Sequence, residues 1–510
     1  MSAKVQPFDR LGETVSRLRR GGKRVVHCHG TFDLIHPGHL VHFEEARSLG
    51  DILVVTLTAG NHVKKGPGRP FFNDRLRAKF LAGLSCVDLV SVVPFPAAKE
   101  AIEAVRPDIY CKGMEYRDKT GDVSGKLSED IRTVRRCGGK VAYVGSVVFS
   151  SSKLLRDGLE TRSKALTQLC TRISKHTSAE KLRQAVEGFR DLRILVVGDI
   201  IFDRYSTVVT QGLTSKNQII SCRFVKEETQ CGGALAVCRH LQQFAPRTQI
   251  LGALGSEAWA SRLMDQATKK GTNLSVSHPD YISIVKQRFV DPRVEGKELS
   301  KLFSVNYLRE GDISPGMEKE VLRRLRQAVP KADAVIVMDF GHGLLTPAIR
   351  KYLQKEARLL VVNCQTNSNN FAFNLINRKY HRADAFAVDS TEMHLAVGKK
   401  KIHFEKELKK LARTLRVKRA WLTQGSVETL GWSPREGLVR CEPLAKAVVD
   451  TVGAGDAFIS MATLAVAKGL PLDLATLLGQ LAGAEAVGIV GNEKPISKTS
   501  LLKGAMSLLS

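Results

Sequence analysis

Short apolar runs of strand length alternate with amphipathic segments along most of this chain, and the alternation forms two separate series. The runs of the first series lie at residues 24–29, 52–58, 89–93 and 140–144. Those of the second lie at residues 193–198, 249–254, 334–339, 359–363, 385–389 and 419–424. Strands that alternate with helical segments, such as 39–49 and 74–84, predict a parallel sheet covered on both faces. We therefore expect two α/β domains.

The length of the chain agrees with this division, because 510 residues are too many for one ordinary hydrophobic core. Residues 153–190 interrupt the alternation, and they are polar, helix-prone and rich in Lys, Arg, Ser and Glu. We predict a first domain at 1–160, a helical linker at 161–185 and a second domain at 186–510.

Composition narrows the classes of function. The sequence has no uninterrupted apolar run of about 18 residues and begins without an apolar leader, so we expect no membrane span and a cytoplasmic location. Its ten cysteines include no Cys-x-x-Cys pair, which favours reduced thiols over disulfides or a zinc site. The net charge of +27 is spread along the chain, without zinc-finger spacing or an aromatic-rich RNA motif. This charge predicts a surface that attracts small phosphorylated substrates rather than nucleic acid.

The first apolar run leads into a stretch from Gly30 to His39 with the sequence GTFDLIHPGH. Its small residues let the backbone approach a ligand, and a helix beginning near Pro37 would direct its positive end at an anion. His36 and His39 lie three residues apart, so both imidazoles can face one ligand. They can donate hydrogen bonds to charge that develops on a pentacoordinate phosphorus and its leaving pyrophosphate. A lone His-x-x-His has little specificity, so the interpretation depends on the surrounding sequence.

This stretch resembles the signature of the cytidylyltransferase-like nucleotidyltransferases, whose HxGH motif binds a nucleoside triphosphate. Further motifs of that family follow in order, namely KG at 65–66, RP at 69–70, Arg77, PD…KG at 107–113 and SSSKLL at 150–155. The resemblance implies a Rossmann-like domain in which a sugar phosphate oxygen attacks the α-phosphorus in line, with Mg²⁺ assisting. It assigns catalysis to His36, His39 and Lys112, and nucleotide binding to Gly30, Thr31, Phe32, Lys65, Arg77, Ser150, Ser151 and Ser152.

Near the other end of the chain, residues 450–458 read DTVGAGDAF. A kinase of a sugar hydroxyl needs a carboxylate that accepts the hydroxyl proton, beside N–H groups that stabilise the transferring phosphoryl group. Gly453, Ala454 and Gly455 at a helix start would supply the N–H groups, and Asp456 would supply the base. A glycine-rich helix start can also be only a tight turn. The whole string, however, resembles the second signature of the ribokinase (PfkB) family.

Other positions extend this second resemblance, which implies a ribokinase-like α/β domain. It assigns sugar binding to Asp203, Gly232 and Gly233, and the organisation of Mg²⁺ and phosphates to Asp389 and Glu392. It assigns the ATP phosphates to Thr423 and Gly425, and the end of the adenine pocket to Gly491.

Together the two halves resemble the bifunctional heptose kinase and nucleotidyltransferase (ADP-heptose synthase) family. That resemblance implies phosphorylation of a sugar phosphate at its anomeric oxygen, the action of a separate phosphatase, and then nucleotidyl transfer to a sugar 1-phosphate. The sequence departs from the family in its reversed domain order, in Leu235 where an Asn is usual, and in an Asp-x-x-Glu that begins at Asp389. Residues 363–374, NCQTNSNNFAFN, stand in place of an Asp-Pro-Lys stretch. They form either a substrate-specific loop or a polar surface loop.

We therefore predict an enzyme that makes an activated sugar, with ATP or CTP as nucleotide, a sugar or sugar phosphate as acceptor and Mg²⁺ as cofactor. We expect neither nucleic acid nor membrane as a partner, and a homodimer is left open. A second interpretation gives the N-terminal site CTP and a polyol phosphate such as glycerol 3-phosphate. In a third interpretation one half is a non-catalytic module, namely the kinase half with its altered sugar contacts. The intact Asp456 argues against the third.

Overall fold

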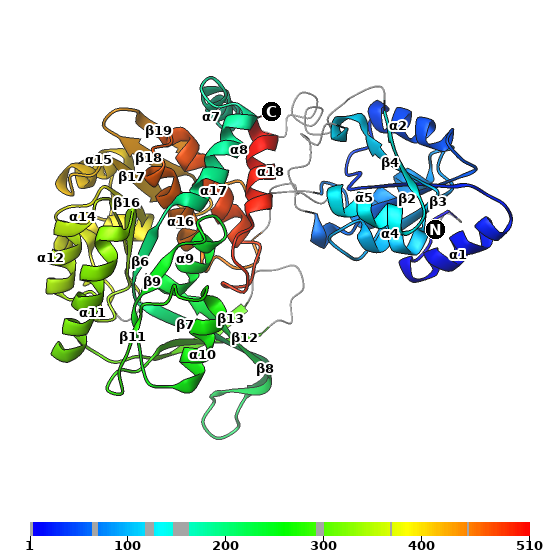
Figure 1. Cartoon of the computed structure of the whole chain (residues 1–510). Helices are drawn as coiled ribbons and strands as arrows, with labels where there is room; N and C mark the ends of the chain where they lie inside the picture. The colour runs from blue at the N-terminus through cyan, green and yellow to red at the C-terminus, as the bar shows by residue number, and fades with distance from the viewer. Residues whose placement is uncertain are drawn as a thin grey trace. The chain divides into compact units, whose positions relative to one another are not determined.

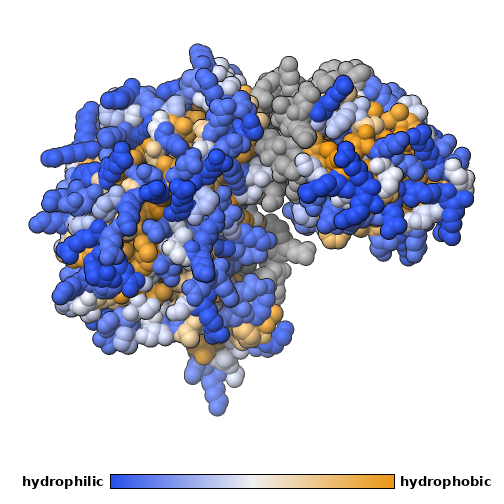
Figure 2. Space-filling view, viewed as in Figure 1, coloured by the Kyte–Doolittle hydropathy of each residue, from blue (hydrophilic) through white to orange (hydrophobic). Residues whose placement is uncertain are grey.

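The computed structural model describes residues 4–63, 70–117, 127–145, 163–291, 300–367, 370–445 and 448–509. They form two units, one within residues 1–163 and the other at 164–501 (Figure 1). On the face of each unit that Figure 2 shows, hydrophilic side chains surround smaller apolar areas. In the described part of the chain, no helix combines the length and the apolar character needed to cross a membrane.

Five parallel strands form the sheet of the first unit, in the order β3-β2-β1-β4-β5. They are β1 (Val25–Gly30), β2 (Ile52–Thr58), β3 (Leu89–Val93), β4 (Ile109–Gly113) and β5 (Lys140–Val144). The structure confirms the four predicted strands and adds β4. The strand order reverses between β1 and β4, and in a parallel sheet ligands bind beyond the carboxyl ends of the strands at such a reversal.

Alternate residues of β1 point to opposite faces of this sheet, and different helices cover the two faces. Val26 and Cys28 pack in one cluster with α2 (Pro37–Arg47) and α3 (Asp74–Ala82). Val25 packs with α1 (Phe8–Arg20) on the other face. On that second face α4 (Lys99–Val105) and α5 (Leu127–Arg136) pack against Tyr110. Burial on both sides explains why the strands read as continuous apolar runs.

The main sheet of the second unit has eight strands in the order β19-β18-β17-β16-β15-β14-β6-β9. Their bounds are β6 (Ile194–Gly198), β9 (Gln249–Leu251), β14 (Ala334–Asp339), β15 (Leu360–Cys364), β16 (Ala385–Asp389), β17 (Arg419–Thr423), β18 (Thr429–Ser433) and β19 (Gly437–Cys441). The strands from β9 to β17 are parallel, and β18 and β19 are antiparallel. Every predicted run of the second series is a strand, and the run at 249–254 also contains β10 (Ala253–Leu254), which pairs with β11 (Val276–Ser277).

Helices cover both faces of this main sheet (Figure 1). One face carries α11 (Pro315–Ala328), α12 (Pro347–Glu356), α14 (Ser390–Val397) and α15 (Phe404–Thr414). The other face carries α9 (Gly233–Gln242), α16 (Ala454–Ala467) and α17 (Leu472–Ala486). The remaining helices include α10 (Ala258–Ala267), α13 (Ile376–Lys379) and α18 (Lys498–Leu509).

A smaller sheet of four strands, in the order β13-β12-β7-β8, was not predicted. It contains β7 (Ile200–Leu213), β8 (Ile220–Gly232), β12 (Ile284–Asp291) and β13 (Ser300–Tyr307). The strand β7 begins two residues after β6 ends, so the chain passes directly from the main sheet into the smaller one. This connection carries Asp203 to the edge of the main sheet where its parallel strands end.

The predicted linker at 161–185 contains α7 (Lys164–Ser174) and α8 (Ala179–Glu187). Leu166, Leu169 and Ile173 of α7 are buried, with the spacing of one helix face. Arg172 pairs with Asp473 of α17 at 3.2 Å. Because these contacts lie inside the second unit, we place the boundary between the units near residue 163 rather than after residue 185.

We predict that Ile173→Ala lowers the unfolding free energy of the second unit by about 2–4 kcal/mol, because it removes a fully buried side chain. The three tryptophans, Trp259, Trp421 and Trp432, all lie in this unit, so urea unfolding followed by tryptophan fluorescence isolates its transition. Lys175→Ala, at an exposed position two residues away, should change this free energy by less than about 0.5 kcal/mol. Equal small effects of both variants would show that α7 is a solvated connection.

Candidate active sites

The N-terminal site is built on the loop between β1 and α2. Gly30 lacks a side chain because the Phe32 ring fills that space, and a Cβ atom on Gly30 would lie 2.9 Å from the ring. Phe32 is buried, with a φ of 44°, and its ring packs edge-on against His39 at 5.5 Å and Phe43 at 5.1 Å between centroids. The structure thus places Phe32, a predicted nucleotide-binding residue, behind the histidine as a support.

The two histidines of the motif lie together where α2 begins. His36 is the N-cap, and its Nδ1 accepts a hydrogen bond from the His39 N–H at 3.3 Å. The centroids of the two rings are 3.8 Å apart. An imidazole whose Nδ1 accepts a hydrogen bond carries its proton on Nε2 when it is neutral. His36 is therefore an Nε2–H donor at a helix end that favours anions.

Arg77 of α3 is buried beneath this loop. Its Nη1 donates to the Thr31 carbonyl at 2.6 Å, and its Nη2 donates to the Thr58 carbonyl at 3.0 Å and to Asp74 Oδ1 at 2.7 Å. The side chain has no exposed surface. The structure therefore gives Arg77 and the Thr31 backbone the task of joining the ends of β1 and β2.

Asp33, which sequence reasoning left without a role, holds a second loop in place. Its Oδ1 accepts hydrogen bonds from the backbone N–H groups of Phe71 at 2.6 Å and Phe72 at 3.1 Å. These residues follow directly on the predicted phosphate-binding segment. Residues 64–69 of that segment, which include Lys65, and the predicted residues Ser150, Ser151 and Ser152 lie outside the described residues.

Lys112, the third predicted catalytic residue, ends up beside β1 because β4 pairs with that strand. Its Nζ pairs with Asp130 Oδ2 of α5 at 3.1 Å and lies 5.2 Å from the centroid of the Tyr110 ring. His27 of β1 is buried next to Tyr110. Burial, and then the charge of Lys112, lowers the pKa of His27 to about 3, so this imidazole is neutral.

The second unit contains a pocket of about 720 Å³ at the carboxyl ends of its parallel strands. Ten predicted site residues line it, namely Asp203, Gly233, Asp389, Glu392, Thr423, Gly425, Gly453, Ala454, Gly455 and Asp456. The two other predicted residues of this domain, Gly232 and Gly491, lie outside the lining. The fold therefore gathers into one pocket residues that are far apart in the sequence.

The glycine-rich motif forms the start of α16 within this pocket. Gly453 is the N-cap, with a φ of 86°, and a Cβ atom there would lie 2.2 Å from Asn492 Oδ1, so the position requires glycine. Gly455 is different, because a Cβ atom on it would meet no atom within 4 Å. The first turn of α16 thus opens onto the pocket with the unpaired N–H groups of a helix start, which suit a phosphoryl group.

Asp456 lies in this first turn and is buried. Burial, and then the negative charge of Asp203, raises the pKa of Asp456 to about 7, although a hydrogen bond from Gln365 opposes the increase. A carboxylate with a pKa near the working pH is suited to accept a proton from a hydroxyl group.

The surroundings of Asp203 on β7 explain why residues 232 and 233 are both glycine. Asp203 forms an ion pair with Arg288 of β12, and a Cβ atom on Gly232 would lie 2.1 Å from Asp203 Oδ2. Gly233 has a φ of 55°, and a Cβ atom there would lie 2.5 Å from the Asp199 carbonyl oxygen. Glycine at both positions lets the start of α9 approach the smaller sheet, where Asp203 faces the pocket.

Asp389 and Glu392, the predicted metal-binding pair, form a capping box at the start of α14. Glu392 N donates to Asp389 Oδ1 at 2.7 Å, and Asp389 N donates to Glu392 Oε2 at 2.9 Å. Burial, and then the charge of Asp389, raises the pKa of Glu392 to about 8. Two carboxylates beside a phosphate site match the oxygen ligands that Mg²⁺ takes together with phosphate and water. No group of three or more His, Cys, Asp or Glu side chains among the described residues could form a metal cage by itself.

Asp450, the first residue of the DTVGAGDAF motif, connects three other residues of this unit. The sequence did not predict this structural role. Asp450 Oδ1 accepts from Lys301 Nζ at 2.7 Å, and Asp450 Oδ2 accepts from the Tyr205 hydroxyl at 3.1 Å and from Gly491 N at 2.9 Å. The predicted adenine-pocket residue Gly491 therefore serves in the structure as a turn fixed to Asp450. A Cβ atom on Gly491 would lie 2.4 Å from Gln230 Oε1.

Lys286 and Arg288 of β12 also line the pocket, and neither was predicted. The available signal was two cations spaced two residues apart between the apolar pairs at 284–285 and 289–290, because alternate strand residues share a face. Residues two apart share a face only in a strand, and the sequence did not predict the strand β12.

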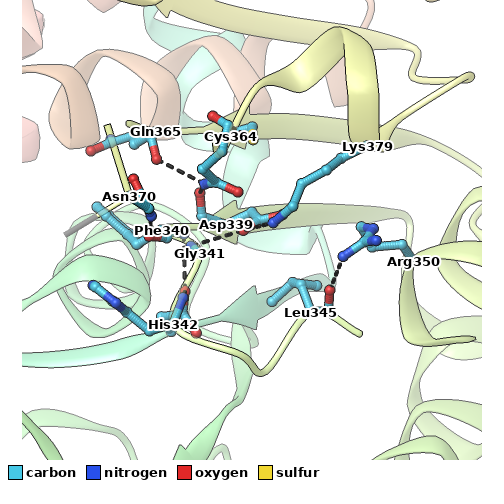
Figure 3. Close-up of polar contacts among 12 residues, drawn as sticks. Asp339, Phe340, Gly341, His342, Leu345, Arg350, Cys364, Gln365, Asn370 and Lys379 are labelled. Atoms are coloured by element: carbon cyan, nitrogen blue, oxygen red, sulfur yellow. Dashed lines mark hydrogen bonds and ion pairs between the residues drawn. The ribbon is translucent and has the colours of Figure 1, made fainter. Parts of the chain in front are cut away.

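Within the segment 363–374, several amide side chains of the described residues form hydrogen bonds to the protein backbone, whereas Phe371 and Phe373 are exposed. Asn367 Nδ2 and Asn370 Nδ2 donate to the Phe340 carbonyl at 2.7 and 2.6 Å. Figure 3 shows Asn370 beside Phe340. Asn374 Nδ2 donates to the carbonyl of Asp339. The carboxylate of Asp339 pairs with Lys379 (Figure 3). The beginning of the segment lines the pocket, with Asn363, Gln365, Thr366 and Asn367.

Comparison with known families agrees with these two sites. Residues 27–156 match the cytidylyltransferase-like family, and residues 345–499 match the pfkB family of carbohydrate kinases. The chain therefore carries an N-terminal cytidylyltransferase-like domain and a C-terminal pfkB-type carbohydrate kinase domain, both of the transferase class.

Curated relatives named bifunctional protein HldE match part of the chain. The one from Koribacter versatilis is 39% identical over 159 residues, which are 31% of this chain and 31% of the relative. The one from Syntrophotalea carbinolica is 39% identical over 147 residues, 28% of this chain and 29% of the relative. The matched region spans less than a third of each relative's length.

Solved structures of phosphofructokinase-2 from Escherichia coli resemble the second unit. A mutant form aligns with a TM-score of 0.51 at 14% identity, covering 62% of this chain and 99% of that one. The complex with potassium aligns with a TM-score of 0.50, the same identity and the same coverage. At this identity the likeness shows the fold, and the second unit is a ribokinase-like α/β domain.

We predict that Gly453→Ala lowers the unfolding free energy of the second unit by about 1–3 kcal/mol, because the backbone conformation and the contact with Asn492 both exclude a side chain. Gly455→Ala, two residues away, should stay within about 0.5 kcal/mol of the wild type. Urea unfolding with tryptophan fluorescence measures both variants. Equal destabilisation by the two would contradict the described start of α16.

Proposed function

We propose that this protein is a bifunctional sugar-activating enzyme. Its C-terminal domain phosphorylates a sugar with ATP, and its N-terminal domain transfers a nucleotidyl group from ATP or CTP to a sugar 1-phosphate, releasing pyrophosphate. The observation that carries this proposal is the single pocket that joins Asp456, the open start of α16 and the carboxylates of Asp389 and Glu392. The partial match to bifunctional HldE proteins supports the combination of the two activities.

In the kinase pocket, Asp456 accepts the proton of the acceptor hydroxyl as its oxygen attacks the γ-phosphorus of ATP. The bond from the γ-phosphorus to the bridging oxygen breaks, and ADP leaves. The N–H groups at Gly455 and Asp456 stabilise the charge of the transferring phosphoryl group. Asp203 binds acceptor hydroxyls. Mg²⁺, held by Asp389 and Glu392 with the phosphates, would supply neutralisation of phosphate charge.

In the N-terminal site, a phosphate oxygen of the sugar 1-phosphate attacks the α-phosphorus of the nucleoside triphosphate. The bond between the α- and β-phosphates breaks on the opposite side, and pyrophosphate leaves. His36 and His39 donate hydrogen bonds to the developing charge, and Lys112 adds a positive charge beside β1. No covalent intermediate is needed, so the protein contributes position and charge.

The kinase acceptor is proposed to carry a phosphate of its own, as a heptose phosphate does. Lys286 is half-buried in the pocket, with Nζ 5.6 Å from the centroid of the Phe340 ring. Among the described residues no hydrogen bond or ion pair to a protein carboxylate engages this Nζ, whereas Arg288 pairs with Asp203. Burial is the main cause that lowers the pKa of Lys286. A desolvated ammonium is costly without a counter-charge, and a phosphate on the acceptor would supply one.

We predict that two variants separate the two activities. His36→Ala should lower pyrophosphate release about 100- to 1,000-fold and spare sugar phosphorylation, because it removes a donor at the N-terminal site only. Asp456→Asn should lower ATP-dependent phosphorylation about 100- to 10,000-fold and spare pyrophosphate release. The assays use each of ATP, CTP, GTP and UTP with Mg²⁺ and a panel of sugars and sugar phosphates.

These variants also test the assignment of each site. Undiminished phosphorylation by Asp456→Asn would remove the proposed base. Pyrophosphate release with CTP and glycerol 3-phosphate, but with no sugar 1-phosphate, would replace the sugar by a polyol phosphate.

We predict that Lys286→Met lowers kcat/KM about 10- to 100-fold for a phosphorylated acceptor, because it removes a charge-assisted contact. For the same sugar without its phosphate, the loss should be less than threefold. The matched control is Lys226→Met, since Lys226 pairs with Glu228 on an exposed part of β8. Equal losses with both acceptors would assign Lys286 to the phosphoryl group that ATP donates.

A further inference from the structure

Two neutral amides link Asp456 to the backbone of the main sheet. Asn363, near the end of β15, donates from Nδ2 to the Ala387 carbonyl of β16 at 3.2 Å. Gln365 donates from Nε2 to Asn363 Oδ1 at 2.7 Å and to Asp456 Oδ1 at 3.2 Å. We call Asn363 and Gln365 the amide relay.

The orientation of the amide relay is fixed by the chemistry of its neighbours. Asn363 must turn its NH₂ group toward the Ala387 carbonyl, which leaves Oδ1 as an acceptor. The amide of Gln365 then lies between two acceptor oxygens, and only its NH₂ group can satisfy both. The backbone of β16 thus determines which atom of Gln365 meets Asp456.

The backbone of Gln365 is held as firmly as its side chain. Its N–H donates to the Asp339 carbonyl at 2.9 Å, and its own carbonyl accepts from Asn374 Nδ2 at 2.8 Å. Figure 3 shows Gln365 next to Cys364, where this segment packs beside Asp339. The relay therefore cannot shift without breaking contacts to the neighbouring strand end.

We propose that Gln365 is a positioning residue for the catalytic base, and that Asn363 fixes Gln365 for this task. This inference rests on the proposed kinase function. The relay occupies Asp456 Oδ1, and among the described residues no hydrogen bond reaches Oδ2. Oδ2 is then the atom that accepts the proton of the acceptor hydroxyl, and the relay directs it toward the pocket.

The neutrality of the relay matters because charged groups already surround Asp456. Asp203 from β7 raises the pKa of Asp456 and Lys286 from β12 lowers it, while Asp456 in turn raises the pKa of Glu392 from α14. Arg288 is paired with Asp203. No hydrogen bond or ion pair in the described part of the chain joins Asp389 or Glu392 to Asp456. A neutral donor orients the carboxylate with less loss of basicity than a second nearby cation would cause.

The test compares two substitutions with opposite expected effects on the pH dependence of phosphorylation. Gln365→Leu removes a donor to the ionised carboxylate, so the pKa of Asp456 rises and the acid limb of kcat/KM moves to higher pH. At pH 6 the activity should fall about tenfold, which corresponds to one pKa unit. Gln365→Lys adds a positive charge, so the acid limb should move to lower pH and the plateau should fall with the weaker base.

Asn370→Ala is the matched control from the same segment, because Asn370 contacts the Phe340 carbonyl rather than Asp456. Its acid limb should stay at the wild-type position. The KM for ATP should stay within about twofold of the wild type in all three variants, which separates repositioning of the base from a damaged nucleotide site.

The outcomes separate failure of this inference from failure of the proposed function. An unmoved acid limb in both Gln365 variants, with wild-type kcat, would show that the relay does not position Asp456. Equal shifts in Asn370→Ala would also overturn the inference. Undiminished phosphorylation by Asp456→Asn would instead overturn the kinase function itself.

Discussion

Both domains depend on the same constraint. A parallel strand that is buried on both faces cannot present polar side chains to a ligand along its length. Polar function is therefore displaced to the carboxyl ends of the strands, where backbone groups are unpaired and helices begin. His36 follows β1 in this way, and Gln365 and Asp389 lie at or just after the ends of β15 and β16. The helix starts at α2 and α16 add N–H donors to the same edges, so each site combines fixed side chains with a helix end that favours phosphate.

In the kinase pocket, acidic and basic side chains shift the pKa of Asp456 in opposite directions. Asp203 disfavours ionisation of Asp456, and Asp456 disfavours that of Glu392, while Lys286 favours ionisation of Asp456, and burial increases each effect. The amide relay contributes a hydrogen bond without a further charge. Asp450 performs the complementary structural task, because its contacts with Tyr205, Lys301 and Gly491 join the smaller sheet to the segment that forms the pocket floor.

The fold could be predicted where strands are buried on both faces, and it was missed where they are not. The runs at 52–58 and 334–339 are continuous in the sequence and form β2 and β14. The strand β4 was not predicted because only three of its five residues are buried, and Lys112 and Gly113 at its end are only partly buried. The smaller sheet was not predicted because the residues of β8 and β13 are largely exposed, so no apolar run or periodicity marks these strands. Likewise α7 looked like a linker because only four of its eleven residues are buried, and polar or charged residues lie between them.

The sequence by itself determined the two α/β domains and the local motifs, because a glycine-rich helix start or a His-x-x-His encodes its geometry within a few residues. Only the tertiary structure decided which side chains face a ligand and which support the site. Phe32 and Arg77 are buried behind the N-terminal loop, whereas Lys286 and Gln365 reach the kinase pocket from strands that carry no motif. The physical reason is that these roles arise from pairing between strands distant in the sequence, which no local pattern records.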